Sequence, residues 1–325
     1  MKQKRLLTML VLLAAVVSGA WAQEPATYKI TLAEGTEDAE NWTVPAEAAA
    51  GTEVTATYNG TKKVKSVKAV KKGGAVDNTY LKWDADQKKL VATDIPAEVT
   101  TVANADQNVN WAARTYVVEG EVTINGMIGL NGDVDLIIKD GAKLTVNKQI
   151  VGYDNGKKLS IYGQANQTGQ LVDNYSGHAI TNVTTLEVHS AKVKATSSAN
   201  SCSGFNKIQT FNVYGGSVDA ESTAASSGYG ISMHSSGSMY IYGGDVKTLG
   251  KGNKFGINGS STTVTVYGGK LWAECAGGKA INPSNVTLTK GAGFNGKIET
   301  SDDNSAWTEY TSTGTPETKC VRVGY

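Results

Sequence analysis

One short pattern recurs along the C-terminal two-thirds of the chain and constrains the fold more than any other feature. Each copy has apolar residues at alternate positions and is followed by a turn that usually contains glycine. The copies start at Leu159, Leu186, Phe211, Met239, Val264 and, in degraded form, Val286, and the segment from Leu136 to Gly141 extends the series upstream. Successive starts lie 27, 25, 28, 25 and 22 residues apart. Self-similarity at such a period indicates a repeat architecture.

Two further short strands flank each copy. The strand after the turn has one inward apolar residue, which is Leu171, Val193, Val218, Val246 or Leu271. The strand before the copy pairs a small residue with an apolar one, as in Ala179-Ile180, Gly204-Phe205, Gly230-Ile231, Gly256-Ile257 and Ala280-Ile281. Three strands per period of about 25 residues is one coil of a right-handed parallel β-helix. We predict this all-β fold over residues 113–310.

The strand period of two decides which side chains point inward. Alternate residues face opposite sides of a strand, so stacked coils place each apolar column on itself at about 4.8 Å per rung. Leu186, Phe211, Met239 and Val264 should then share one interior. We do not expect a leucine-rich repeat or a propeller, because the sequence contains neither the Leu/Asn consensus of the first nor the four-stranded blade repeat of the second. An antiparallel sandwich remains an alternative, although it predicts no matching of columns.

The chain ends predict export and capping. Residues 1–22 combine a basic start, an apolar stretch from Leu6 to Val17 and the exit Ala20-Trp21-Ala22. These features are typical of a signal peptide cleaved after Ala22, and no Cys stands at the cleavage point to carry an acyl anchor. We expect a small antiparallel β module at 24–73, with strands at 28–32, 42–44, 54–58 and a lysine-rich 64–70. Residues 74–112 should contain a hairpin at 80–92 and form a linker or N-terminal cap. Residues 311–325 should form a C-terminal capping strand.

Composition excludes several classes of partner and site. Removing the signal peptide leaves 28 Lys+Arg against 30 Asp+Glu, so nucleic acid is not expected as a partner. No later segment has the length of a transmembrane helix. The odd number of cysteines, Cys202, Cys275 and Cys320, cannot all pair within the chain. His178, His189 and His234 fall at different positions of different coils, so we predict no metal site. Ca²⁺ is possible but unsupported by the residues.

Two segments carry a resemblance to known proteins. The run from Val54 to Lys71, VTATYNGTKKVKSVKAVK, and the run from Leu136 to Val146, LIIKDGAKLTV, resemble segments of secreted proteins of gut Bacteroidota. In those proteins a small β module precedes a pectin-lyase-like β-helix. The resemblance covers most of the mature chain and implies architecture. It does not imply one activity, because the superfamily includes lyases, hydrolases, adhesins and glycan binders.

The charged residues give little support for an enzyme. The mature chain has only two arginines, Arg114 and Arg322, and it lacks the Asn-Thr-Asp, Asp-Asp, Gly-His-Gly and Arg-Ile-Lys signatures of pectin hydrolases within the coils. Glu221 and Glu274 should lie two rungs apart on the outer face of the second strands, near the separation of an inverting carboxylate pair. They are weak catalytic candidates. Asp219, between Lys194 and Lys247 on neighbouring rungs, favours a neutralising charge ladder instead.

The aromatic residues point more sharply to a site. Tyr162, His189, Tyr214, Tyr242 and Tyr267 share one outward column just before the turn, and Trp272 points outward on a neighbouring strand. Flat rings with a polar tip suit sugar binding. The alternative is that these rings only cover the corner and support one another.

Three functions remain open. The first is an exported, non-catalytic β-helical protein, carbohydrate-binding or adhesive at the cell surface, with Tyr214, Tyr242, Tyr267 and Trp272 as ligand-binding residues. The second is a polysaccharide lyase or glycoside hydrolase working near Glu221 and Glu274. The third is a structural or protein-binding surface protein. An exported protein could reside in the periplasm, on the outer surface of the cell or in the medium, and the sequence does not distinguish these locations.

Overall fold

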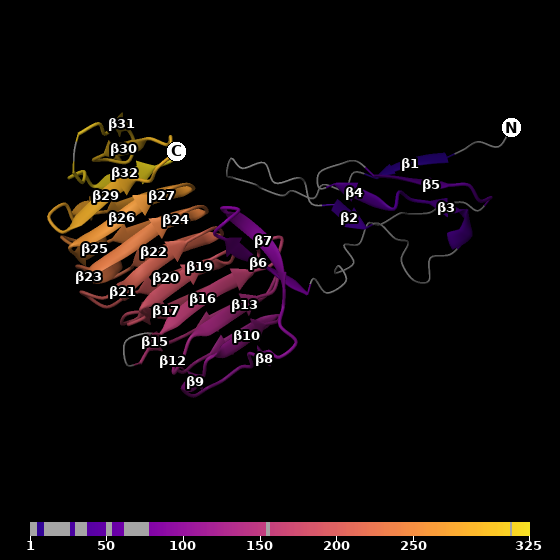
Figure 1. Cartoon of the computed structure of the whole chain (residues 1–325), viewed down its shortest axis with the longest axis horizontal. Helices are drawn as coiled ribbons and strands as arrows, with labels where there is room; N and C mark the ends of the chain where they lie inside the picture. The colour runs from indigo at the N-terminus through magenta and orange to yellow at the C-terminus, as the bar shows by residue number, and fades with distance from the viewer. Residues whose placement is uncertain are drawn as a thin grey trace. The chain divides into compact units, whose positions relative to one another are not determined.

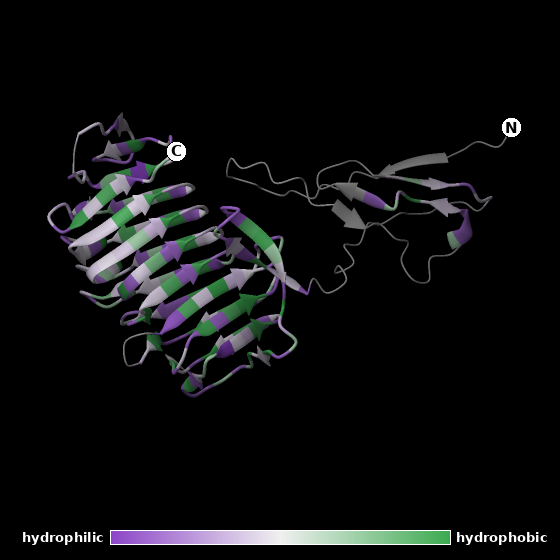
Figure 2. Ribbon diagram, viewed as in Figure 1, coloured by the Kyte–Doolittle hydropathy of each residue, from purple (hydrophilic) through white to green (hydrophobic). Residues whose placement is uncertain are grey.

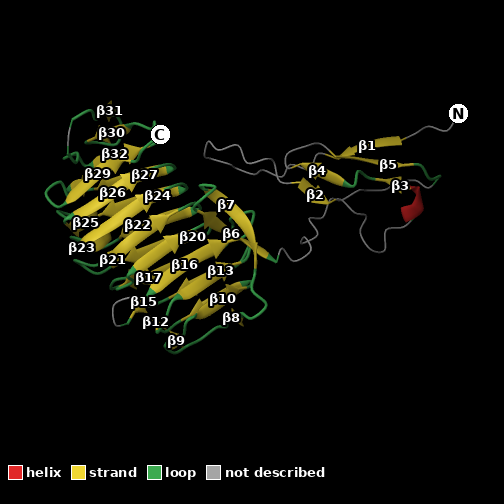
Figure 3. Ribbon diagram, viewed as in Figure 1, coloured by secondary structure: helices red, strands yellow, loops and turns green. Residues whose placement is uncertain are grey.

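The computed structural model describes residues 38–49, 54–61, 78–153, 157–312 and 314–325, together with strands at 5–9 and 27–29. Nearly all of the described secondary structure is strand (Figure 3). The chain divides into two compact units, residues 1–76 and residues 77–325, and each is described separately.

The N-terminal unit contains two small antiparallel sheets. One sheet orders the strands β1 (Arg5–Met9), β5 (Val54–Tyr58) and β3 (Trp42–Thr43), and the other pairs β2 (Thr27–Lys29) with β4 (Glu47–Ala49). A short 3-10 helix, η1 (Ala39–Asn41), precedes β3. The predicted lysine-rich strand at 64–70 lies outside the described residues. Cleavage at the predicted site after Ala22 would remove β1 from its sheet.

The second unit is a parallel β-helix of about seven coils of roughly 25 residues each (Figure 1). The strands that contain the repeated pattern, here called main strands, are β10 (Arg114–Val118), β13 (Val134–Ile138), β16 (Lys158–Gly163), β19 (Thr185–Val188), β21 (Ser203–Val213), β23 (Tyr229–Ile241), β26 (Thr262–Val266) and β29 (Val286–Lys290). The second strands, which follow the turn, are β11 (Glu121–Ile124), β14 (Lys143–Val146), β17 (Gln170–Tyr175), β20 (Lys192–Ser197), β22 (Ser217–Ser222), β24 (Asp245–Gly250) and β27 (Lys270–Cys275). The third strands are β9 (Val109–Trp111), β12 (Ile128–Leu130), β15 (Ile150–Gly152), β18 (Ile180–Thr181), the first halves of β21 and β23, β25 (Phe255–Ser260) and β28 (Lys279–Ile281).

Parallel register stacks the apolar columns as predicted. Leu186 pairs with Phe211, Phe211 with Met239, and Met239 with Val264, and all four side chains are fully buried in one core. Apolar and polar bands alternate along the strands (Figure 2). Burying each such apolar side chain stabilises the fold by about 1.5–3 kcal/mol, and vertical stacking lets coils that have no independent core share one.

Three stacked glycines form the corner between main and second strands, and Gly324, which follows β32, packs on the last of them. Gly216, Gly244, Gly269 and Gly324 all have positive φ, and a Cβ on any of the last three would lie 2.3–2.6 Å from the carbonyl oxygen of the preceding member. Left-handed backbone and close backbone approach both require glycine. We call these four residues the glycine corner.

The segments before and after the coils differ in their placement. Residues 79–94 form the predicted hairpin, with β6 (Thr79–Asp84) antiparallel to β7 (Lys89–Asp94). The hairpin lies on the outside of the coils, against β16, and not over an end.

The strands β8 (Thr100–Thr101) and β9 begin the first coil by pairing with β10 and β12. At the other end, β32 (Cys320–Val323) pairs antiparallel with β27 and with β30 (Ile298–Ser301), and β31 (Thr308–Glu309) completes that sheet.

Candidate functional site

The outward aromatic residues stack into a continuous column. Ring centroids lie 4.4 Å apart for Tyr162 and His189, 4.7 Å for His189 and Tyr214, 5.2 Å for Tyr214 and Tyr242, and 5.0 Å for Tyr242 and Tyr267. Interplanar angles are between 5° and 29°, so each pair is stacked. These five residues are the aromatic column. Because the rings face one another, each inner ring can offer a ligand only its edge and polar tip.

The hairpin covers the N-terminal part of this column. Tyr80 meets Tyr162 edge to face at 4.7 Å, and the Trp83 ring lies 5.2 Å from Tyr214 and 5.6 Å from Tyr242. Leu90, on the second strand of the hairpin, contacts the backbone of Gly215. Tyr214, one of the predicted ligand-binding residues, therefore lies beneath the hairpin.

Hydrogen bonds hold the hairpin to consecutive coils. Gln164 Nε2 donates to Thr79 O over 3.0 Å. Ser190 Oγ lies 3.1 Å from both Leu81 O and Gly163 O, and its one hydrogen is shared between these two acceptors. The backbone N–H of Trp83 donates to His189 Nδ1 over 3.0 Å. The edge of the hairpin is thus fixed by side chains of the coils, and no strand pairing is needed.

Glu187 is the charged group beneath the hairpin. Its Oε2 lies 2.9 Å from Lys158 Nζ and 3.5 Å from His189 Nε2, and it accepts a hydrogen bond from Ser160 Oγ. Burial alone would raise the pKa of Glu187, but the hydrogen bonds from His189 and Lys158 outweigh burial and lower this pKa to about 2. Burial lowers the pKa of His189, although Glu187 acts in the opposite direction. The pair is therefore an anionic carboxylate beside a neutral imidazole near pH 7.

The C-terminal end of the column is open. Tyr242 is half-buried, and Tyr267 keeps 38% of its surface exposed, with the backbone of Gly291 against one side of its ring. Among the described residues, the large hydrophobic side chains that are exposed are Val99, Tyr267 and Tyr325. Tyr267 ends the main-strand side of the glycine corner, whereas the Tyr325 ring lies on the second-strand side, beside Lys270 and Trp272.

Trp272 belongs to a second group of rings beyond this corner. Its ring meets Trp307 at 5.0 Å and Tyr325 at 5.7 Å, both edge to face, and its Nε1 donates to Glu274 Oε2. We call Trp272, Trp307 and Tyr325 the C-terminal aromatic cluster. The Arg322 guanidinium lies 4.2 Å from the Trp307 ring centroid. Tyr325 keeps 49% of its surface exposed. Trp307 and Tyr325 follow no repeat, so no periodic signal in the sequence connects them to Trp272.

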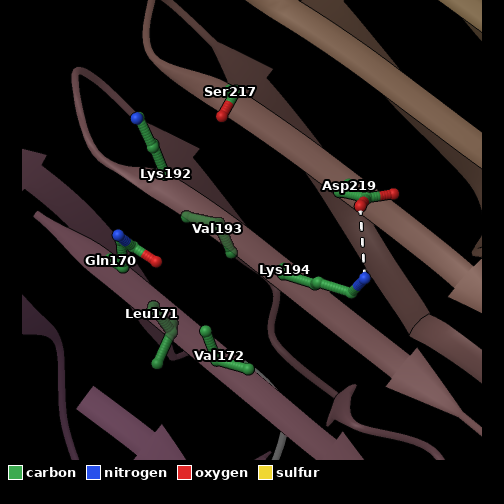
Figure 4. A pocket seen from close by; sticks show the side chains of 8 residues that line it. All are labelled: Gln170, Leu171, Val172, Lys192, Val193, Lys194, Ser217 and Asp219. Atoms are coloured by element: carbon green, nitrogen blue, oxygen red, sulfur yellow. Dashed lines mark ion pairs between the residues drawn. The ribbon is translucent and has the colours of Figure 1, made fainter. Parts of the chain in front are cut away.

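The weak catalytic candidates stand as the register predicted. Leu249 pairs with Glu221 on one side and Glu274 on the other, so the two acids are two rungs apart. Lys194 Nζ lies 3.4 Å from Glu221 and 3.6 Å from Asp219. A shallow hollow of about 180 Å³ lies beside this ion pair, between β17, β20 and β22 (Figure 4). The charged groups neutralise one another across rungs, which favours the charge ladder.

The histidines and cysteines do not gather into a reactive or metal-binding group. His178 Nδ1 accepts a hydrogen bond from the Ser203 N–H, and His234 Nδ1 lies 3.0 Å from Ser235 O. The three cysteines are free thiols, and burial, followed by nearby acidic side chains, raises the pKa of Cys320 to about 11. Within the described ranges no cluster of three metal-ligating side chains occurs. No helix in those ranges has the length and apolar character needed to cross a bilayer.

Comparison of the chain with protein-family models, curated proteins and solved structures found no match.

Proposed function

We propose that the protein is an exported, non-catalytic polysaccharide-binding protein whose binding site is the open end of the aromatic column together with the C-terminal aromatic cluster. The observation that carries the proposal is the exposure of Tyr267 and Tyr325 on the two sides of the glycine corner. Tyrosines that present a flat apolar ring and a polar tip to water suit the binding of sugars.

The two groups of rings would contribute different contacts. Tyr242 and Tyr267 are stacked on each other, so they present ring edges and hydroxyl groups that can hydrogen-bond to sugars. Tyr325 is packed edge to face with Trp272, and the Lys270 ammonium lies over its ring at 5.0 Å from the centroid, so Tyr325 offers a sugar its remaining exposed surface and its hydroxyl group. The glycine corner has no side chains between them, so a polymer could contact both groups.

Affinity electrophoresis through gels that contain soluble polysaccharides tests this proposal. We expect Tyr267→Ala and Tyr325→Ala each to weaken retention about 2- to 13-fold, from roughly 0.5–1.5 kcal/mol per aromatic contact. Trp272→Ala is less clean, because it also removes packing from the C-terminal strands.

Tyr229→Ala is the matched control, since this half-buried tyrosine lies at the start of β23, in neither group of rings. Circular dichroism melts would verify that each variant folds. Full retention of a folded Tyr267→Ala, Tyr325→Ala double variant would contradict the proposal, as would retention of the wild type on none of the gels.

A further inference from the structure

Beside the aromatic column, the last four main strands present a face without charge. Eight outward residues on β21, β23, β26 and β29 form two further columns in continuous register. These residues, here called the neutral polar face, are Thr210, Asn212, Ser238, Tyr240, Thr263, Thr265, Thr287 and Thr289. All are at least partly exposed except Thr265, which is buried. Seven of the eight carry a hydroxyl group.

The same columns are charged on the earlier coils. There they hold Asp135, Lys158 and Glu187, beside the part of the aromatic column that the hairpin covers. The outer face of the second strands is also charged, as the Lys194–Asp219 ion pair illustrates (Figure 4). Charged residues make up 19% of the chain, and soluble surfaces are normally richer in charge than the whole. The loss of charge therefore coincides with the open end of the aromatic column.

The neutral polar face is a regular array. Unbroken parallel register spaces its residues by about 4.8 Å between rungs and roughly 6.5–7 Å along each strand. The β-branched threonines have restricted χ1 angles, which limits the positions of their hydroxyl groups. Thr265 Oγ1 and Thr289 Oγ1 lie 3.2 Å apart, within hydrogen-bonding distance. The array borders the open tyrosines, because the ring of Tyr240 lies 6.3 Å from that of Tyr242.

We propose that this face binds the extended backbone of an uncharged polysaccharide, which would lie along the coil axis beside Tyr242 and Tyr267. The inference rests on the proposed function and adds the ligand class and a subsite. Hydroxyl groups both donate and accept, as sugar hydroxyls do. None of the eight residues is a lysine or arginine, and the exposed Lys290 next to Thr289 is the one cation at the end of β29. Over the other rungs, uronate or sulfate groups would lose their hydration and gain no ion pair. A protein partner fits less well, because these eight residues include neither Trp nor Arg and only one aromatic residue, Tyr240.

Matched pairs of polymers test the ligand class. Hydroxyethylcellulose is compared with carboxymethylcellulose, and methyl-esterified homogalacturonan with polygalacturonate, by affinity electrophoresis of the whole protein. We expect the uncharged member of at least one pair to be bound about tenfold more tightly, with little dependence on salt.

Charge insertion tests the subsite. Thr287→Glu, at an exposed position, should weaken binding of the neutral polymer about tenfold, because it would leave a carboxylate against sugar without a partner. Ser217→Glu, on the second strands, is the control and should bind as the wild type does. Thr287→Ser keeps the hydroxyl and should also bind normally.

Different failures have different meanings. Tighter, salt-sensitive binding of the carboxylated polymers would overturn the neutral-ligand inference and leave the proposed function standing. Binding that Tyr267→Ala weakens but Thr287→Glu does not would overturn the subsite alone. Absence of binding to every polymer would overturn both proposals, and self-association abolished by Thr287→Glu would then assign the face to a second copy.

Discussion

The backbone N–H of Trp83 donates to Nδ1 of His189, and 106 residues separate the two. Because Nδ1 accepts this bond, the imidazole is neutral and carries its proton on Nε2, which lies 3.5 Å from Glu187 Oε2. The hairpin is thus attached to the coils through a group that can titrate.

We predict that acid weakens docking of the hairpin. Protonation of His189 would place a proton on Nδ1 opposite the Trp83 N–H and remove the bond. Burial lowers the pKa of His189 below its ordinary 6.5, so the undocked state takes up the proton first. The stabilisation is therefore complete above about pH 6.5 and is lost as pH falls through the docked-state pKa.

The groups around His189 make the sign testable. Glu187 favours the protonated form, whereas Lys158 and Lys82 oppose it. Hydrogen exchange of peptides spanning 79–94, corrected for intrinsic rates, should show protection that declines with acid. His189→Phe keeps an aromatic ring at this position but removes the titrating group, so the pH dependence of this protection should disappear. The free energy of hairpin opening should also fall by about 1–3 kcal/mol, because the hydrogen bond from Trp83 is lost. A pH-dependent loss that persists in His189→Phe would contradict the assignment.

Trp83 should supply much of the packing that docks the hairpin. Trp83→Ala removes the ring that lies against Tyr214 and Tyr242. We expect the free energy of hairpin opening, measured by hydrogen exchange, to drop by roughly 2–3 kcal/mol. This is at the low end for truncation of a buried tryptophan, because Trp83 is only half-buried. The melting temperature of the coils should change little, since their main core contains no hairpin residue and Trp83 is not part of the smaller buried cluster that Tyr80 shares with Tyr162. Above pH 7, where His189 is neutral, Lys82→Ala at the exposed neighbouring position should leave protection unchanged. An equal effect of both variants at that pH would refute the role of the ring.

Periodicity explains which parts of this molecule could be predicted. Leu186, Phe211, Met239 and Val264 recur at one period, and parallel stacking converts that period directly into contact. The same argument correctly placed Tyr242 above Tyr214 and Leu249 between Glu221 and Glu274. Contacts between equivalent positions of neighbouring coils are therefore readable from one sequence.

Contacts made by segments outside the repeat were not predictable in this way. Trp83 and Tyr80 lie in a hairpin whose sequence carries no register with the coils, so its position over Tyr214 could not be inferred. Trp307 and Tyr325 are likewise outside the repeat, and only the fold brings them to Trp272. The alternation of inward and outward residues predicts that these rings lie on the outer face, but it does not predict that stacked rings turn their faces toward one another.

Asp173 should destabilise the protein at neutral pH. Its side chain points into the core between Val146 and Ala195, and neither carboxylate oxygen has a hydrogen-bond partner within the described residues. Burial raises the pKa of Asp173 well above its ordinary value, while the Ile150 N–H, which already donates to Ala179 O, opposes this only weakly. The native state therefore holds the proton more tightly than the unfolded state. This contribution to stability is complete below about pH 3.8 and declines as pH rises toward the native pKa.

Replacing Asp173 by Val should raise the free energy of unfolding at pH 7 by about 1–3 kcal/mol, because it removes a buried polar group that lacks partners. Urea unfolding between pH 4 and pH 8 measures this. The gain should be larger at pH 8 than at pH 4, and Asp173→Asn should lose the same pH slope without the full gain. A variant that is less stable than the wild type across this range would show that the carboxyl group is satisfied in solution.

The glycine corner should tolerate no side chain where coils touch. Gly141 and Gly269 have similar positive φ values, +75° and +69°, but a Cβ would meet nothing within 4 Å at Gly141 and would lie 2.3 Å from Gly244 O at Gly269. Gly141→Ala should therefore cost only the backbone term of about 1–2 kcal/mol. Gly269→Ala must also push two coils apart, so we expect a loss of more than about 3 kcal/mol in urea unfolding. Equal losses for the two variants would mean that backbone conformation alone, and not the contact between coils, requires glycine at this corner.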